Sequence, residues 1–113
     1  MSNNNQWVPI CNESDLINNI GVCANINGKQ VAIFRLESGG EQKLYGIDNH
    51  DPFSGSNVLS RGLVGDLKGY DVVASPIYKQ HFDLATGQCL EDDTVSLTVY
   101  PVRANAGKIE VAA

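Results

Sequence analysis

The chain has 113 residues and a formal net charge of -5, from 13 acidic and 8 basic residues. This length fits one domain and is too short for two. The few basic residues are scattered, which argues against nucleic acid and anionic lipid as partners, because both are bound by clustered Lys and Arg. No apolar run reaches the roughly 20 residues that a membrane-spanning helix needs.

The N-terminal segment and the cysteines indicate a reduced, cytoplasmic protein. Residues 1–6 are polar and lack the basic and apolar regions of a signal peptide, so we expect a disordered tail at 1–6 and a single domain at 7–113. The cysteines are Cys11, Cys23 and Cys89, an odd number without C-x-x-C or C-x-H spacing. This pattern argues against a disulfide framework, and we expect three reduced, buried, small apolar side chains.

In chain order, the first half predicts short strands separated by tight turns. Residues 7–11 predict a strand at a sheet edge, because Pro9 cannot donate a backbone hydrogen bond. Asn27-Gly28 lies between two β-rich runs and favours a two-residue hairpin turn, because both residues tolerate positive φ. The run 31–34 is almost entirely apolar, so we expect that strand to be covered on both faces.

The second half continues the pattern. Gly, Pro, Asn and Asp separate further β-rich runs, which predict strands at 43–47, 70–74, 80–84, 95–103 and 108–111. Residues 14–17 could form one helical turn, and no longer helix is supported. About nine or ten short strands at a spacing of roughly 8–12 residues predict an all-β fold, an antiparallel β-sandwich or barrel.

The sequence carries no complete catalytic motif. It lacks G-x-S-x-G, a Walker loop, G-x-G-x-x-G and H-E-x-x-H. The two histidines, His50 and His81, have no local pattern that supports a Ser-His-Asp arrangement, and His81 is interpreted as a strand-surface residue. We therefore expect this chain to act as a subunit of a larger enzyme, with no catalytic site of its own.

Two loops carry the most informative residues. The first is Asp48-Asn49-His50-Asp51-Pro52-Phe53, and the second runs from Ser75 to Gly87. The second loop ends in Phe82-Asp83-Leu84-Ala85-Thr86-Gly87, which resembles the strand and turn after the second cluster-binding loop of Rieske-type iron–sulfur domains. In that family the loops read C-x-H and C-x-x-H, and two Cys and two His hold a [2Fe–2S] cluster. The resemblance implies a Rieske-like fold with two exposed loop tips.

The same resemblance places the four ligand positions at Asp48, His50, Ser75 and Tyr78, where only His50 keeps a ligand type. Without thiolates one iron loses all of its protein ligands, so we expect neither a cluster nor another metal in this chain. His50 could belong to a residual metal or proton-transfer site with Asp48 and Tyr78. A loop histidine that bonds its neighbours is favoured, because metal sites need three or four matched ligands.

From Trp7 to Val111 the chain is similar to the small subunit of bacterial cytoplasmic NAD(P)H-dependent nitrite reductase. The stretches that carry the resemblance, in order, are Gly21-Val22-Cys23-Ala24, Gln30-Val31-Ala32-Ile33-Phe34-Arg35, Asp51-Pro52-Phe53, Val58-Leu59-Ser60-Arg61-Gly62, Val73-Ala74-Ser75-Pro76 and Glu91-Asp92. The resemblance implies a large-subunit partner that carries FAD, a [4Fe–4S] cluster and sirohaem and reduces nitrite to ammonium in nitrate assimilation. This chain would be the accessory subunit that docks on it.

The loop tips are the expected docking face. The candidate residues are Asp51, Pro52, Phe53, Pro76, Tyr78 and Lys79. Phe53 has two open interpretations, a side chain tucked under its own loop or an exposed anchor for the partner. Two alternatives remain for the whole chain: a Rieske-type ferredoxin that carries electrons, and a stand-alone β domain that binds a ligand or another protein.

Overall fold

The computed structural model describes residues 6–38 and 40–113, with the side chain of Ser38 excepted. The tail expected at residues 1–6 therefore lies outside the described residues, apart from Gln6. No helix in the described part of the chain is long and apolar enough to cross a membrane.

Twelve strands form four antiparallel groups within the described residues. The first sheet has the order β1 (Trp7–Asn12), β12 (Lys108–Ala112), β11 (Val102–Asn105). The second has the order β10 (Val99–Tyr100), β4 (Glu41–Asp48), β3 (Lys29–Ser38), β2 (Val22–Ile26). The third is the hairpin β5 (His50–Asp51), β6 (Ser56–Asn57), and the fourth has the order β7 (Leu63–Leu67), β8 (Tyr70–Ala74), β9 (His81–Asp83). The 3₁₀ turns η1 (Glu13–Asp15) and η2 (Leu59–Arg61) complete the elements.

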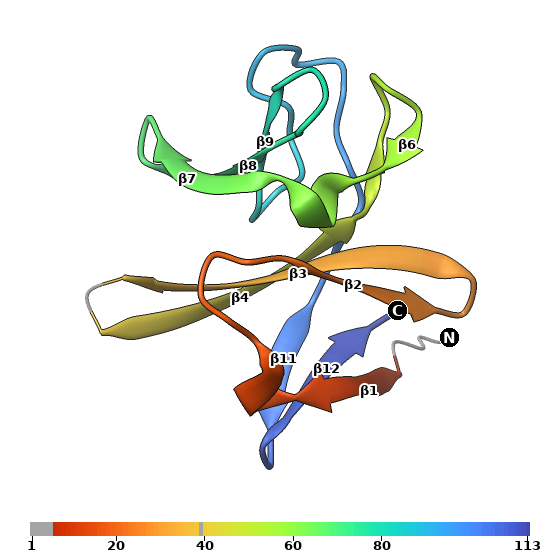
Figure 1. Cartoon of the computed structure of the whole chain (residues 1–113), viewed down its shortest axis with the longest axis vertical. Helices are drawn as coiled ribbons and strands as arrows, with labels where there is room; N and C mark the ends of the chain where they lie inside the picture. Colours follow the sequence, from red (N-terminus) through yellow and green to blue (C-terminus); the bar gives the residue numbers. More distant parts are fainter. Residues whose placement is uncertain (1–5, 39) are drawn as a thin grey trace.

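The central strand β3 separates two hydrophobic clusters. Val31 and Ile33 point into a cluster with β12, and Ala32 and Phe34 point into a second cluster beneath the loops. All four side chains are fully buried, so the strand is covered on both faces as its apolar run predicts. Figure 1 shows the two halves, with β1, β11 and β12 below β3 and the β5–β6 hairpin and β7–β9 above it.

Two local predictions are confirmed. Asn27 and Gly28 have φ of 53° and 83° at the turn between β2 and β3, the positive values that this hairpin turn requires. Pro9 lies in β1, which is the edge strand of its sheet, and the register shifts between Pro9 and Cys11.

Three sequence-based expectations are wrong. A continuous strand does not form over 95–103, because Asp92 accepts backbone bonds from Thr94 and Val95 in a turn and leaves only β10 and β11 as strands. The two glycines at 65 and 69 predict a turn over residues 65–69, but residues 65–67 belong to β7 and the turn is confined to Lys68 and Gly69. Cys23 is exposed on the edge strand β2 and Cys11 is half-buried, so only Cys89 is a buried thiol.

Candidate functional site

Asp51 connects the two loops that the sequence singles out. Its fully buried carboxylate accepts hydrogen bonds from the Ser75 hydroxyl at 2.5 Å, the Ser54 hydroxyl at 3.0 Å and the Phe53 amide at 2.9 Å. Burial alone raises the pKa of this carboxyl, but the hydrogen bonds from Ser75, Phe53 and Ser54 outweigh burial and hold the pKa below its usual value. Asp51 is therefore an ionised group that ties the first loop to the second.

The second loop folds tightly around the buried Ser75. The Ser75 amide donates to the Gln80 carbonyl at 2.9 Å, and the Lys79 amide donates to the Ser75 carbonyl at 3.1 Å. The Ile77 amide donates to the Ser75 hydroxyl at 3.3 Å. These bonds fix the shape of the loop and leave Ile77, Tyr78 and Lys79 exposed at its tip.

Asn49 anchors the first loop and was not identified from the sequence. Its buried side chain donates to Gln30 Oε1 and to the Asn57 carbonyl, each at 3.1 Å, and accepts from the Ser60 amide at 2.7 Å. These bonds join the loop to β3, β6 and η2. An Asn directly after a strand is ordinary turn chemistry, so the sequence holds no signal for this role.

His50 is a loop histidine that bonds its neighbours. The side chain is exposed in the β5–β6 hairpin, and Nδ1 lies 2.9 Å from Asn57 Oδ1. The His50 amide donates to Asp48 Oδ1 at 3.0 Å. Both bonds are to residues of the first loop and its hairpin, which agrees with the simpler of the two interpretations of His50.

His81 is also held by a neighbour. It begins β9, its amide donates to Glu91 Oε1 at 2.7 Å and its Nδ1 lies 2.6 Å from Glu91 Oε2. Burial raises the pKa of Glu91, but the bonds from His81 outweigh burial and the pKa is lowered. The arrangement agrees with the interpretation of His81 as a strand-surface residue.

The expected ligand positions do not fit a [2Fe–2S] cluster. The Ser75 hydroxyl is buried against Asp51, and Tyr78 is 59% exposed at the tip of the second loop. The three cysteines lie outside both loops, so no thiolate is available where a Rieske cluster needs two. Among the described residues no three His, Cys, Asp or Glu side chains gather as a metal-binding group.

The six candidate docking residues differ in exposure. Pro52, Tyr78 and Lys79 are exposed, Pro76 is half-buried and Asp51 is buried. Phe53 is half-buried against the core, with its ring centroid 6.2 Å from that of Phe82. The structure therefore supports the tucked interpretation of Phe53, in which the side chain supports its loop from beneath.

Comparison with known proteins assigns the family. The profile of the Rieske-like [2Fe-2S] domain matches residues 6–112. The nitrite reductase (NADH) small subunit of Escherichia coli (strain K12) is 42% identical over 106 residues, which cover 94% of this chain and 96% of that protein. The chain belongs to the nitrite reductase small-subunit family. The Rieske-like all-β fold and the small-subunit family expected from the sequence are thus confirmed.

Two further relatives are a solved structure of similar fold and a longer nitrite reductase chain with a similar segment. The NMR structure of the E. coli protein NirD superposes with a TM-score of 0.88 at 40% identity, covering 97% of this chain and 98% of that one. The nitrite reductase [NAD(P)H] large subunit of Klebsiella oxytoca is 37% identical over 105 residues, which cover 93% of this chain but 11% of that protein. A domain like this small subunit is therefore one segment of a much longer nitrite reductase chain.

Proposed function

We propose that this chain is the accessory, non-catalytic small subunit of a cytoplasmic NAD(P)H-dependent nitrite reductase, which reduces nitrite to ammonium in nitrate assimilation. The observation that carries the proposal is the full-length similarity to the E. coli small subunit. The match to a segment within a Klebsiella large subunit supports pairing, because a domain fused to an enzyme in one organism works beside that enzyme.

The redox groups of the proposed enzyme belong to the large subunit, namely FAD, a [4Fe–4S] cluster and sirohaem. This chain binds none of them. The support is the chemistry of its loops, in which Asp48, Ser75 and Tyr78 stand at three of the four positions that a Rieske cluster needs for Cys and His. The ferredoxin alternative requires those ligands, so the donor set argues against it.

The proposed docking face is the loop end. Tyr78, Lys79 and Pro52 would contact the large subunit directly, with Pro76 at the margin. Asp51 and Phe53 would act from beneath, because one ties the two loops together and the other packs under its own loop. A rigid loop pair loses little conformational entropy on binding, which favours affinity.

The proposed mechanism is stabilisation of the catalytic subunit. A partner that binds only the folded, active conformation raises the population of that conformation by mass action. No electron or proton needs to pass through this chain. Activity should therefore depend on the concentration of the small subunit and saturate when the large subunit is fully bound.

The test compares the large subunit alone with the large subunit plus this chain. We expect faster nitrite-dependent oxidation of NAD(P)H and a higher melting temperature in the mixture, and a colourless small subunit that contains no stoichiometric iron when it is purified without oxygen. Equal activity and equal melting temperature in both samples would refute the accessory role. Stoichiometric iron with a Rieske-type visible spectrum would favour the ferredoxin alternative.

A further inference from the structure

The outer face of the β7–β8–β9 sheet carries an exposed leucine, Leu63. Leu63, Ala74 and His81 are direct cross-strand partners, so their side chains lie on the same face of the sheet. The neighbouring row of Val64 and its partners points into the core. Leu63 is thus held on the outer face, where it is 75% exposed, more than any other large apolar residue that the structure describes.

The second loop joins β8 to β9 at the same end of the sheet as Leu63. The loop begins directly after Ala74, and Ile77 and Tyr78 in it are 43% and 59% exposed. The hydrogen bonds around Ser75 hold both residues in place. Leu63, Ile77 and Tyr78 form what we call the Leu63–Tyr78 face. Fixed, exposed aromatic and aliphatic side chains are typical of protein interfaces.

Two cations flank the Leu63–Tyr78 face. Lys79 lies beside Tyr78, and Arg61 precedes Gly62, which packs so closely on Ala74 that an added Cβ would lie 2.4 Å from the Ala74 carbonyl. Both cations are exposed, and neither forms an ion pair with another residue that the structure describes. The Lys79 ammonium donates to the Pro76 carbonyl at 3.1 Å and keeps its charge. In a chain of net charge -5, Arg61 and Lys79 therefore place two positive charges without a carboxylate partner among the described residues at the margin of this face.

We propose that the Leu63–Tyr78 face, with Arg61 and Lys79 at its margin, docks on a surface of the reductase large subunit where apolar side chains are surrounded by carboxylates. The inference rests on the proposed pairing with that subunit. The occupant follows from local charge complementarity: Arg61 and Lys79 are exposed at the margin of this face, so carboxylates on the partner would meet opposite charges here, whereas like charges juxtaposed at an interface are costly. The cations steer an acidic surface to this face, and the apolar residues supply the affinity.

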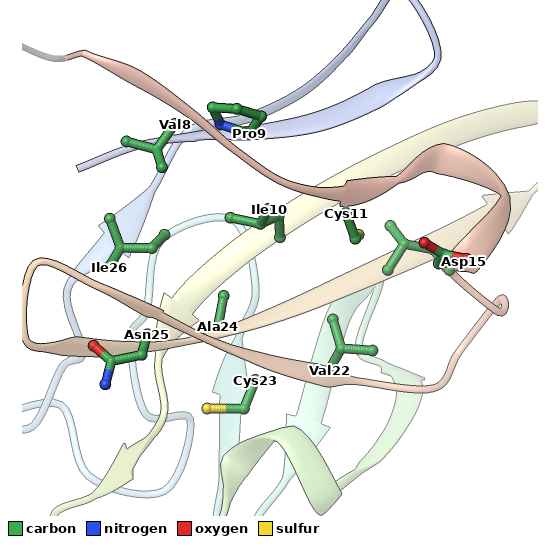
Figure 2. Close-up of a pocket in the computed structure, with 11 residues that line it drawn as sticks. Val8, Pro9, Ile10, Cys11, Asp15, Val22, Cys23, Ala24, Asn25 and Ile26 are labelled. Carbon is green, nitrogen blue, oxygen red and sulfur yellow. The ribbon is translucent and has the colours of Figure 1, made fainter.

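A groove between β1 and β2 is the rival surface. It has a volume of about 360 Å³ and lies between the two edge strands of the main sheets. Figure 2 shows Ile10, Val22 and Ala24 directed into it and Cys23 directed away. The lining contains no Lys or Arg and includes Asp15, so nothing in the groove would select an acidic partner.

The test measures binding of the large subunit, purified on its own, to immobilised variants of this chain. Tyr78→Ala and Leu63→Ser should each weaken binding about ten-fold or more, as central interface residues do. Lys79→Glu should weaken binding at low salt and reduce its dependence on ionic strength, because the attraction it removes is screened by salt. Circular dichroism and thermal melting confirm that each variant is folded.

The chain offers matched controls on the far end of the β7–β8 hairpin. Tyr70 is 50% exposed there, so Tyr70→Ala is the control for Tyr78→Ala. Lys68 and Lys79 are both exposed and both have positive φ, of 55° and 69°, so Lys68→Glu matches Lys79→Glu in charge and in backbone strain. Both controls should bind within about two-fold of wild type, as residues outside an interface do.

Each outcome separates the two proposals. If wild type binds and only the face variants weaken binding, the docking face is supported. If wild type binds but the face variants behave as their controls do, or Lys79→Glu tightens binding, this inference and the docking of Tyr78 and Lys79 are both overturned, while the accessory role stands. If only Val22→Asp, a variant of the groove, lost binding, docking would be assigned to the groove, and the proposal for the Leu63–Tyr78 face would be overturned. If wild type does not bind, both proposals fail.

Discussion

The two sides of β3 are stabilised differently. Below it, the cluster of Val31, Ile33, Ile109 and Val111 is aliphatic. Above it, the cluster that contains Phe34 and Phe82 lies beneath the two loops. All buried polar residues of the described chain lie on this upper, loop side: Asn49, Asp51, Ser75 and Asp83.

The buried polar residues of the loop half explain how a Rieske-like fold can be stable without the four ligands of an iron–sulfur cluster. A Rieske cluster joins two loops through four protein ligands. In this chain a hydrogen bond of 2.5 Å between Asp51 and Ser75 joins the same two loops. Non-directional apolar burial tolerates substitution in the lower half, whereas a buried carboxylate requires its donors in place. The loop half should therefore be the more sensitive half to small changes.

The largest effect is expected from a cavity in the loop half. Phe82→Ala removes a fully buried ring and should lower the free energy of unfolding by about 3–5 kcal/mol. Urea unfolding followed by far-UV circular dichroism and by fluorescence of Trp7, the only tryptophan, measures it. Because one small domain unfolds as a unit, both signals should shift together. Separate transitions would show instead that the two halves unfold independently.

The next effect tests the polar link itself. Asp51→Ala removes the acceptor for three donors in a buried site and should cost about 2–4 kcal/mol, as charged hydrogen-bond groups do. Asp66→Ala, at an exposed position on β7, is the control and should stay within about 0.5 kcal/mol of wild type. A comparable loss in both variants would show that Asp51 is not a structural link.

The Asp51 link also has a defined pH dependence. The pKa of Asp51 is lower in the folded protein than its usual value, so its stabilisation is complete above the unfolded pKa of about 3.9 and is lost as pH falls through the folded pKa. Unfolding free energies measured from neutral to acid pH should therefore decrease less steeply in Asp51→Ala than in wild type. A steeper decrease in the variant would contradict the assignment.

Local signals made much of the fold predictable. The Asn27-Gly28 turn and the doubly buried run 31–34 follow from backbone sterics and apolar patterning, which act over a few residues. The strand expected over 95–103 failed for a local reason as well, since the Asp92 turn competes with the ladder. Alternation of apolar residues could not reveal that the adjoining backbone was already hydrogen-bonded.

The candidate site was less predictable because its contacts are long-range. Asp51 and Ser75 are separated by 24 positions, and nothing near either residue indicates the other. In the sequence, Leu63 and Val64 form a short apolar pair, and only the pairing of Leu63 with Ala74 places its side chain on the outer face of the sheet. A register determined by the whole sheet decides whether such a residue faces the core or the solvent.

A smaller effect is expected from Tyr45 at alkaline pH. The Tyr45 hydroxyl donates to Asp71 Oδ2 at 2.8 Å beneath the loops. Burial raises the pKa of Tyr45 most, and the bond to Asp71 and the nearby carboxylates add to the effect, so that the pKa is about 12. Its stabilisation is complete below the unfolded pKa of about 10 and is lost as pH rises through the folded pKa. Tyr45→Phe should cost about 0.5–1.5 kcal/mol at neutral pH.

Above the unfolded pKa of about 10 the stability of Tyr45→Phe should decrease less steeply than that of wild type. Urea unfolding at several pH values between neutral and strongly alkaline measures the slope. Tyr70→Phe, at an exposed tyrosine, is the control and should retain the wild-type slope. If Tyr45→Phe also retained the wild-type slope, the phenol would not contribute to alkaline unfolding.

The smallest effect is expected from a polar contact in the lower half. Arg103 Cζ lies 4.1 Å from the centroid of the Trp7 ring, and Nε donates to Glu110 at 2.7 Å across the β11–β12 ladder. The Arg103 side chain is substantially exposed, so water competes for these contacts. Arg103→Lys keeps the charge but loses the planar stack, and should cost about 0.5–1 kcal/mol.

The fluorescence of Trp7 should change in Arg103→Lys, because the guanidinium no longer lies over its ring. A second variant, Arg103→Ala, also removes the ion pair with Glu110. High salt should reduce the difference in unfolding free energy between wild type and Arg103→Ala, since an exposed ion pair is screened. The same salt should leave the larger cost of Asp51→Ala nearly unchanged, because Asp51 and Ser75 are fully buried. Equal salt dependence at the two positions would contradict the distinction between a solvated and a buried polar contact.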